Sequence, residues 1–281
     1  MINIINVRDP EQIFHYQLQF EAPYFFPVEY NTWLHSFADD TDGEGRTLFR
    51  DLSVKAAYRN GKLVGFIQYG NTAFGFDDSG EISSQVSYCV IRNLYFDENC
   101  ADAGDALLQA ALDTFPKGAR VYAFFHYFGM TCFARHGKLF QRHAHIEEFL
   151  KIHGFVIEHE NVYYSSMLQD DSRSEVTLLP QELSKGHHQY VAFTLSGNSV
   201  GGCEIHFVSS NTAYLRWIFV NHDLTGQGIG SQCMAALQHW LYLQGIRRFD
   251  TDTALQNTVA QHFYEKNHFT REGITRSYYR P

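Results

Sequence analysis

The sequence has too little positive charge for a protein that works mainly by neutralising nucleic acid. Its 22 Lys and Arg residues are outnumbered by 31 Asp and Glu residues, which gives a formal net charge of −9 at pH 7. Affinity for phosphate backbones comes chiefly from clustered Lys and Arg side chains. We therefore expect no nucleic-acid partner, and a cationic or neutral partner fits better.

The cysteines lack the spacing of a disulfide framework or a zinc ribbon. The five cysteines include no C-x-x-C pair, so we expect reduced thiols and no zinc ribbon. Four histidines between residues 126 and 145 crowd one region, and His143 and His145 face one way if that segment is a strand. No carboxylate or cysteine completes a recognisable spacing, and we therefore predict that the protein binds no metal.

Long hydrophobic runs and a secretion signal are also missing. The N-terminal stretch MINIINVRDPEQ has neither the basic start nor the apolar run of a signal peptide. No window reaches the roughly 18 apolar residues that a membrane helix needs. We expect a cytoplasmic protein without a membrane partner.

The length of 281 residues lies near the upper limit of one hydrophobic core, so two domains are the better expectation. Residues 54–70 carry apolar positions on both sides of Asn60-Gly61, which predicts a β-hairpin with a type I′ turn. Residues 190–207 repeat this arrangement around Ser196-Gly197-Asn198. Two similar hairpins indicate two similar units.

The second half of the chain predicts the element order β-β-β-α-β-α-β. The hairpin is followed by a strand of β-branched and aromatic residues, and residues 229–243 then show helical spacing of apolar side chains. Gly245 is a natural stop for this helix. A short strand, a second helix and a last strand near Tyr278 complete the series.

The first half predicts a parallel series of elements. Residues 149–155 align with residues 263–269 with both phenylalanines in step. We interpret this as an internal duplication with a polar, charge-rich linker at residues 169–175. We therefore expect one domain at residues 1–170 and another at residues 175–281.

Three glycines, at positions 226, 228 and 230, join a predicted strand to a predicted helix. The first amide groups of a helix have no partner inside it, and glycines let the backbone curl close to a ligand. Such a concave loop favours a phosphate or pyrophosphate. We expect an anion site whose donors are the amides of residues 227–231.

The loop resembles the pyrophosphate loop of the GNAT superfamily of acyl-CoA-dependent N-acetyltransferases, whose pattern is Q/R-x-x-G-x-G/A. Here it is Thr225-Gly226-Gln227-Gly228-Ile229-Gly230, so Thr225 departs from the first position. A second family pattern is matched by Asn257, Ala260, Phe263, Tyr264 and Phe269, with His268 in place of a glycine. The resemblance covers residues 190–279 and, more weakly, the first half.

The resemblance implies an α/β (α+β) fold of two GNAT-like domains, each a mixed, mostly antiparallel twisted sheet flanked by helices. It also implies acetyl-CoA (CoA) as co-substrate. The cofactor-binding residues that it implies are Ile218, Phe219, Val220, Thr225, Gly226, Gln227, Gly228, Ile229, Gly230, Ser231, Asn257, Ala260 and Tyr264. The three strand residues would offer backbone groups to the pantetheine arm, and Asn257 would reach the same arm.

Tyr264 occupies the family's general-acid position, where a phenol returns a proton to the thiolate of departing CoA. An ordinary pKa of about 10 keeps a phenol protonated at neutral pH. Without the motif around it, the same residue is a core aromatic on a helix. We predict an N-acetyltransferase that moves an acetyl group from acetyl-CoA to a primary amine of a small molecule or peptide by direct attack. The alternative is a non-catalytic acyl-CoA-binding or regulatory module.

The strands before the loop offer no convincing general base. The inward positions of the nearer strand are Tyr214 and Arg216, and the preceding strand carries Glu204 and His206. A tight hairpin would place Glu204 and His206 on the face opposite Tyr214, whereas a bulge would reverse that. The base and the amine acceptor stay open. So do the oligomeric state, monomer or homodimer, and a contribution of the first domain to the acceptor site.

The first half lacks the glycine loop. Asp97, Glu98, Asp102 and Asp105 crowd the start of its predicted helix, where carboxylates suit the helix dipole but repel a pyrophosphate. Leu150 stands where the second half has Tyr264. We predict that the first domain binds no CoA and acts as a structural partner.

A dinucleotide-binding fold is the rival explanation of the glycines. Asp250 lies about twenty residues beyond them, as that fold expects. However, Ser231 occupies the position of the third glycine of that pattern, and no lysine follows as in a phosphate-binding P-loop. The dinucleotide interpretation is therefore the weaker one.

Overall fold

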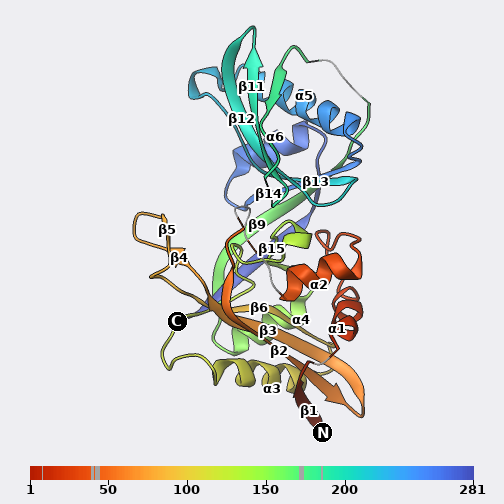
Figure 1. The fold of residues 1–281 in the computed structure, drawn as a ribbon, viewed down its shortest axis with the longest axis vertical. Helices are drawn as coiled ribbons and strands as arrows, with labels where there is room; N and C mark the ends of the chain where they lie inside the picture. Colours follow the sequence, from red (N-terminus) through yellow and green to blue (C-terminus); the bar gives the residue numbers. More distant parts are fainter. Residues whose placement is uncertain (8, 39–40, 42–44, 171–173, 185) are drawn as a thin grey trace. The chain divides into compact units, whose positions relative to one another are not determined.

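The computed structural model in Figure 1 describes residues 1–7, 9–38, 41, 45–170, 174–184 and 186–281. The chain forms two compact units. Unit 1 comprises Met1–Asp42, Arg46–Glu160 and Thr275–Pro281, and unit 2 comprises Gly43–Gly45 and Asn161–Ile274. Each unit combines helices with a mostly antiparallel sheet that contains one parallel pair, which confirms the predicted fold class.

Unit 1 carries the elements of the first half of the chain. Its strands are β1 (Ile2–Asn6), β2 (Phe49–Arg59), β3 (Lys62–Thr72), β4 (Gly75–Phe76), β5 (Ile82–Ser83), β6 (Cys89–Phe96), β7 (Val121–Ala123) and β8 (Leu139–Phe140). Its helices are α1 (Pro10–Gln17), α2 (Tyr30–Ala38), α3 (Ala101–Leu112), the short η1 (Thr131–Phe133) and α4 (Ala144–Ile152). The strand order is β1-β2-β3-β6-β7.

Unit 2 has the predicted element order, preceded by one further strand. Its strands are β10 (Thr177–Pro180), β11 (His188–Leu195), β12 (Asn198–Phe207), β13 (Thr212–Val220) and β14 (Arg248–Ala254). Its helices are the short η2 (His222–Leu224), α5 (Ile229–Leu243) and α6 (Thr258–Lys266). The strand order is β14-β13-β12-β11-β10, and the β13–β14 pair is parallel.

Two long strands belong to both units. In β9 (Val156–Met167), residues 161–167 pair with β14 of unit 2. In β15 (Thr270–Arg280), residues 278–280 pair with β7 and residues 275–276 pair with β8, all within unit 1. The predicted domain boundary between residues 170 and 175 stays a prediction.

The two predicted hairpins are confirmed. Asn60 and Gly61 both have positive φ, 51° and 79°, between the paired Arg59 and Lys62, as a type I′ turn requires. In the second hairpin Ser196 and Gly197, with φ of 50° and 80°, join Leu195 to Asn198.

The core of unit 2 lies between its sheet and α5. Four side chains at helical spacing, Cys233, Met234, Leu237 and Leu241, are fully buried on one face of this helix. They pack in one cluster with inward residues of the strands such as Ile205 and Leu215. Gly245 follows the helix with φ of 91°, which confirms it as the stop. This packing fixes the start of α5 relative to the end of β13.

The sheet of unit 1 has α1 and α2 on one face. Phe37 O of α2 accepts a hydrogen bond from Gln68 Nε2 of β3 (2.6 Å). Ser36 O accepts one from Arg92 Nη1 of β6 (3.0 Å). Backbone carbonyls of α2 therefore satisfy polar side chains that the sheet presents to this face.

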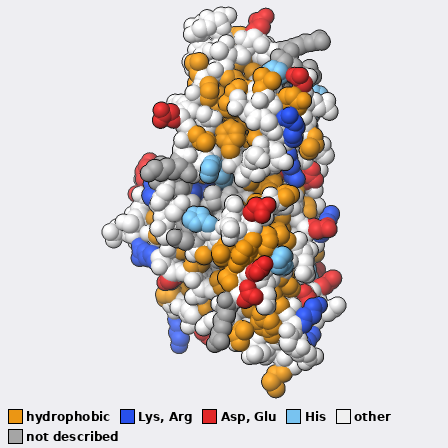
Figure 2. Space-filling view, turned by 45° about the vertical axis from the view of Figure 1, so that its right-hand side comes forward, with side chains coloured by type: hydrophobic (Ala, Val, Ile, Leu, Met, Phe, Trp, Pro, Cys, Tyr) orange, Lys and Arg blue, Asp and Glu red, His pale blue; other side chains and the backbone are white. Residues whose placement is uncertain are grey.

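The surface has no large field of one sign on the face that Figure 2 shows, where acidic and basic side chains are interspersed with hydrophobic ones. Among the described residues, no helix is long and apolar enough to cross a membrane.

Candidate functional site

A cavity of about 460 Å³ opens in unit 2 between the end of β13, the start of α5 and α6. All predicted cofactor-binding residues line it except Gln227 and Ile229. The structure also brings Leu224, Val259, Phe263 and Lys266 to its wall. Residues that lie about 45 positions apart in the sequence thus surround one space.

The three loop glycines serve two purposes. Gly226 and Gly228 have φ of 76° and 82°, and a Cβ atom at either would meet nothing within 4 Å. Glycine is favoured at these two positions because residues with a side chain adopt such a positive φ only at a cost in conformational free energy. A Cβ at Gly230 would lie 3.2 Å from the Phe263 ring, so this glycine lets α5 approach α6 closely.

The start of α5 has no side-chain cap, since Gly228 is its N-cap residue. The first amides of a helix have no intrahelical partner, and Gly228, Gly230 and Ser231 at the start of this helix line the cavity. Together with the positive end of the helix dipole they suit an anion. Two neighbours brace the loop instead, because Thr225 Oγ1 donates to His222 O (2.7 Å) and Gln227 Nε2 donates to Asp223 O (2.8 Å).

The strand edge beside the cavity is open. β13 and β14 pair in parallel only up to Leu215 and Thr251, and Thr251 Oγ1 donates to Leu215 O (3.0 Å) at the last rung. Beyond that point, residues 218–220 pair with β12 on one side. Their other edge lies along the cavity, where an extended ligand arm can pair as an added strand.

Asn257 and Lys266 lie at opposite ends of α6 and both line the cavity. Asn257 Oδ1 accepts from Ala260 N (3.1 Å) and caps the helix, which accounts for this motif position even without a ligand. Lys266 is exposed, and the sequence reasoning missed it. A cation in the last turn of a helix is common, so only its place at the cavity marks it.

Tyr264 lies on α6, 6% exposed, and lines the cavity. Burial raises the pKa of its phenol, a hydrogen bond with Thr251 lowers it, and the nearby Asp252 carboxylate raises it further. The pKa therefore lies above its ordinary value, and the phenol keeps its proton at neutral pH. It can donate that proton to a stronger base in the cavity.

The opposite face of the β12–β13 pair corrects one expectation. Glu204 pairs with Trp217 and Ile205 with Leu215, so Arg216 is the extra residue of a β-bulge. Beyond the bulge His206 pairs with Tyr214, and paired residues share a face of the sheet. Glu204 and His206 therefore lie on the same face as Tyr214, and the tight-hairpin expectation was wrong.

Glu204 is held by three neighbours on this face. Its carboxylate lies 2.8 Å from His188 Nδ1, 2.8 Å from Trp217 Nε1 and 3.4 Å from Arg216 Nε. The hydrogen bond with His188 lowers the pKa of Glu204, and Arg216 and Trp217 add to this against the effect of burial. Glu204 is thus an ionised carboxylate held by its neighbours, and its lowered pKa makes it a poor general base.

Asp252 is a carboxylate that the sequence reasoning missed. It follows Thr251, at the point where β14 departs from β13. Its Oδ1 accepts from the Tyr214 hydroxyl and its Oδ2 from Asn161 Nδ2, both at 2.5 Å. Asn161 Oδ1 is buried without a hydrogen-bond partner in the described part of the chain. Strand alternation along FDTDT could have indicated it, because Asp252 shares a face with Asp250.

Asp250, the residue that favoured a dinucleotide, lies elsewhere. It is fully buried, with Arg248 Nη2 and the Tyr163 hydroxyl each donating to its Oδ2 at 2.8 Å. Burial raises its pKa to about 6, against the opposing effect of Arg248. It lines no part of the cavity, so it offers nothing to a ribose there.

The corresponding place in unit 1 is filled. The Phe96 and Phe149 rings lie 5.0 Å apart beside the start of α3, and a Cβ at Gly104 would lie 2.9 Å from Phe96. His145 Nε2 lies 3.0 Å from Phe96 O, so a strand carbonyl that would face a ligand arm has a partner already. This geometry supports the prediction that the first domain binds no CoA.

The histidines of residues 126–145 do not form the strand that was considered for them. His143 precedes α4 as its N-cap residue and His145 lies in its first turn, because residues 144–152 have an apolar face at helical spacing. Burial lowers the pKa of His143 to about 4, and His145 and Arg142 act in the same direction. In the described residues, no group of three or more His, Cys, Asp and Glu is arranged to hold a metal ion.

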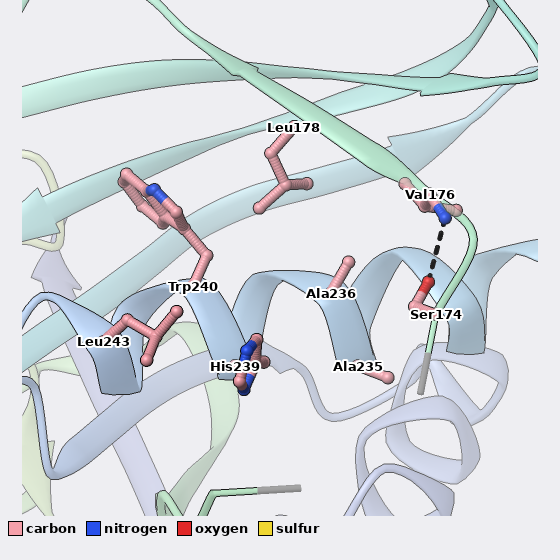
Figure 3. A pocket seen from close by; sticks show the side chains of 8 residues that line it. All are labelled: Ser174, Val176, Leu178, Ala235, Ala236, His239, Trp240 and Leu243. Atoms are coloured by element: carbon pink, nitrogen blue, oxygen red, sulfur yellow. Dashed lines mark hydrogen bonds between the residues drawn. The ribbon is translucent and has the colours of Figure 1, made fainter. Parts of the chain in front are cut away.

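A second cavity in unit 2, of about 270 Å³, lies between β10 and the outer face of α5. Figure 3 shows Val176 and Leu178 facing Ala236 and Trp240 across it. The polar contact drawn there, Val176 N donating to Ser174 Oγ (3.1 Å), lies within the wall itself. With mostly apolar walls, this cavity has none of the anion-binding features of the first.

Part of the sequence matches known acetyltransferases. Residues 154–269 match the acetyltransferase (GNAT) family. Aminoglycoside N(6')-acetyltransferase type 1 from Salmonella typhimurium is 33% identical over 66 residues, which are 24% of this chain and 43% of that protein. The protein of the same name from Salmonella enteritidis matches with the same figures. The chain thus spans less than half the length of the curated relatives it matches.

Solved structures match over the whole chain. A tandem GNAT protein from the clavulanic acid biosynthesis pathway has a TM-score of 0.61 at 11% identity, with 99% of this chain and 98% of that chain covered. A GCN5-related N-acetyltransferase from Sphaerobacter thermophilus has a TM-score of 0.58 at 9% identity, with 100% and 96% covered. At such identities the likeness shows the fold alone.

Proposed function

We propose that unit 2, which contains most of the match to the acetyltransferase (GNAT) family at residues 154–269, binds acetyl-CoA and transfers its acetyl group to an amine. The observation that carries the proposal is the cavity, which joins an open strand edge to the uncapped start of α5. Acetyl-CoA supplies a thioester whose carbonyl carbon an amine can attack. The open edge of residues 218–220 holds the pantetheine arm and the amides of residues 229–231 hold the pyrophosphate.

Lys266 adds a positive charge to the same wall. The cofactor carries several phosphate charges, and an ammonium group binds phosphate as a point charge. We therefore place Lys266 with the residues that bind CoA. The side chains of Gln227 and Ile229 contribute structure rather than contacts, because neither lines the cavity.

Tyr264, which lines the cavity, and Asp252, next to the last rung between β13 and β14, handle the protons. The amine nitrogen forms the new C–N bond while the C–S bond breaks, and the electron pair of that bond leaves on sulfur. Tyr264 donates its phenolic proton to this sulfur. The proton of the attacking amine goes to Asp252, which Tyr214 and Asn161 hold in place, and the unpartnered Asn161 Oδ1 can orient an amine N–H.

The alternative is an acyl-CoA-binding module without turnover. Thr225 and His268 depart from the family patterns, and the structure gives each of them a local role. The Thr225 hydroxyl is occupied by His222 O. His268 keeps the positive φ, 67°, that a glycine would adopt there, so the backbone conformation is retained at a cost of about 1 kcal/mol.

Calorimetric titration separates these proposals. We expect acetyl-CoA to bind at one site per chain and NAD not to bind. A panel of amines, including an aminoglycoside, a polyamine, an amino acid and a peptide, then reports release of the CoA thiol. Acetyl-CoA binding without transfer to any amine favours the binding module. If acetyl-CoA does not bind, both the transferase and the binding module are contradicted. Binding at two sites per chain would contradict the prediction that the first domain binds no CoA.

A further inference from the structure

Unit 1 contains a copy of the β-bulge that lies opposite the cavity in unit 2. In unit 1 Gln68 pairs with Asn93 and Tyr69 with Ile91, so Arg92 is the extra residue. In unit 2 the extra residue is Arg216. In both units the preceding residue, Ile91 or Leu215, forms the last rung of the parallel strand pair. The two arginines therefore occupy equivalent positions at the point where the sheet splays.

Arg92 shows what an arginine at this position binds. It is 2% exposed, and three of its contacts are to backbone carbonyl oxygens. Nε donates to Phe128 O (2.9 Å), Nη1 to Ser36 O (3.0 Å) and Nη2 to Gly129 O (3.1 Å). The fork of donors is thus filled by peptide oxygens from α2 and from the loop after β7.

Arg216 presents the same fork without such partners. Its Nε lies 3.4 Å from Glu204 Oε1, while Nη1 and Nη2 donate no hydrogen bond to any residue that the structure describes. The side chain is one-third exposed. It also lies near Tyr214, since its charge opposes the rise in the pKa of that phenol, and Tyr214 donates to Asp252.

An aromatic row borders this fork. The Tyr190 and Trp217 rings lie 5.7 Å apart and the Trp217 and Phe219 rings 5.9 Å apart. Trp217 and Phe219 are 40% and 47% exposed, and Phe219 also lines the cavity. Such rings offer stacking area to a planar or aromatic group. The N–H donors of Arg216 thus lie beside aromatic rings on which a ring of a ligand can stack.

We propose that the amine acceptor carries a carboxylate or peptide carbonyl close to its amine, and that Arg216 binds this oxygen. The proposal rests on the proposed acetyl transfer. Two parallel N–H donors match a carboxylate or a pair of carbonyls. A free α-amino acid and the N-terminus of a peptide share this chemistry, and the aromatic row favours an aromatic first side chain. A polycationic acceptor has no oxygen acceptor of this kind and meets the charge of Arg216.

The test is a matched series of amines with one ring. Phenylalanine has a carboxylate, phenylalanylglycine amide has a peptide carbonyl but no carboxylate, and phenethylamine has neither. We expect kcat/KM for the first or second to exceed that for phenethylamine at least about tenfold, as for a charge-assisted hydrogen bond. Preference for phenylalanine assigns the oxygen to a free carboxylate, and preference for phenylalanylglycine amide assigns it to a peptide carbonyl. Phenethylamine or spermidine as the best acceptor overturns the proposal.

The matched variants are Arg216→Met and Arg271→Met, which each remove one exposed guanidinium of unit 2. We expect Arg216→Met to lower the preference for the oxygen-bearing amine by about tenfold or more and Arg271→Met to leave it unchanged. An unchanged preference in Arg216→Met overturns the proposal while the transferase itself stands.

A binding experiment tests the same proposal without acetyl transfer. Calorimetry compares N-acetylphenylalanine with N-acetylphenethylamine, and we expect tighter binding of the acid, lost in Arg216→Met. If acetyl-CoA does not bind, the proposed function fails, and this experiment alone decides. Equal binding of both compounds, or no binding, then overturns the proposal.

Discussion

The loop glycine at position 228 allows the cofactor assignment to be tested against a matched control. Gly228 has φ of 82° and Gly197, in the β11–β12 turn, has φ of 80°. At either position a Cβ would meet nothing within 4 Å. Gly228 lines the cavity and Gly197 does not. Substitution by aspartate therefore imposes the same backbone strain and adds the same charge, but only one of the two charges lies beside the proposed anion site.

The magnitudes follow from these facts. An L-residue in the left-handed region costs about 1 kcal/mol, so both variants should lose about that much free energy of unfolding. A carboxylate about 4 Å from a phosphate charge costs about 1 kcal/mol in water and about 4 kcal/mol at an effective dielectric constant of about 20. Gly228→Asp should therefore weaken acetyl-CoA binding by about fivefold to about a thousandfold, and Gly197→Asp should not.

Titration calorimetry at low and high salt measures this difference. The loss in Gly228→Asp should shrink at 1 M salt, where the screening length is about 3 Å. Urea unfolding of both variants controls for strain. Equal affinity of Gly228→Asp and the unsubstituted protein, or an equal loss in Gly197→Asp, would refute the assignment of the pyrophosphate to this loop.

Two other predictions concern proton transfer and pH. Tyr264→Phe and Asp252→Asn should each lower kcat by about 100-fold or more with little change in the affinity for acetyl-CoA, whereas the control Tyr242→Phe should change neither quantity. Steady-state kinetics measures kcat and calorimetry measures the affinity of each variant. An unchanged kcat would remove the substituted residue from the mechanism. His143 has a folded-state pKa of about 4, below its ordinary value of 6.5, so the native state binds fewer protons and the free energy of unfolding should fall by up to about 3 kcal/mol as pH drops from 7 to 4. Urea unfolding of His143→Gln should show a smaller fall, with the exposed His15→Gln as control, and equal falls in all three proteins would contradict burial as the cause.

Local signals in the sequence were sufficient for the hairpin turns of both units and for helix α5 of unit 2. Asn60-Gly61 and the spacing from Ile229 to Gly245 determine structure through a few neighbouring residues, and both predictions are confirmed. Local signals failed where packing decides. The segment after Arg120 has the aromatic composition of a long strand, but β7 ends at Ala123 because Phe124 turns away with φ of 54°.

The acceptor face shows the same division. The family patterns predicted most of the residues that line the cavity, because these residues are near one another in the sequence or follow the spacing of the family pattern. Asp252 and Asn161 meet only because β9 pairs with β14, a contact between segments about 90 residues apart. The bulge at Arg216 depends on register, and one extra residue reverses the face of every residue beyond it.

The course of β9 and β15 has a consequence for the two halves as pieces of a gene. A fragment of residues 1–170 lacks residues 275–280, which pair with β7 and β8, and a fragment of residues 175–281 lacks residues 161–167, which pair with β14. Each fragment would present a bare strand edge, the usual start of aggregation. We therefore expect the two halves to depend on each other's strand residues, so that neither folds stably as a separate fragment.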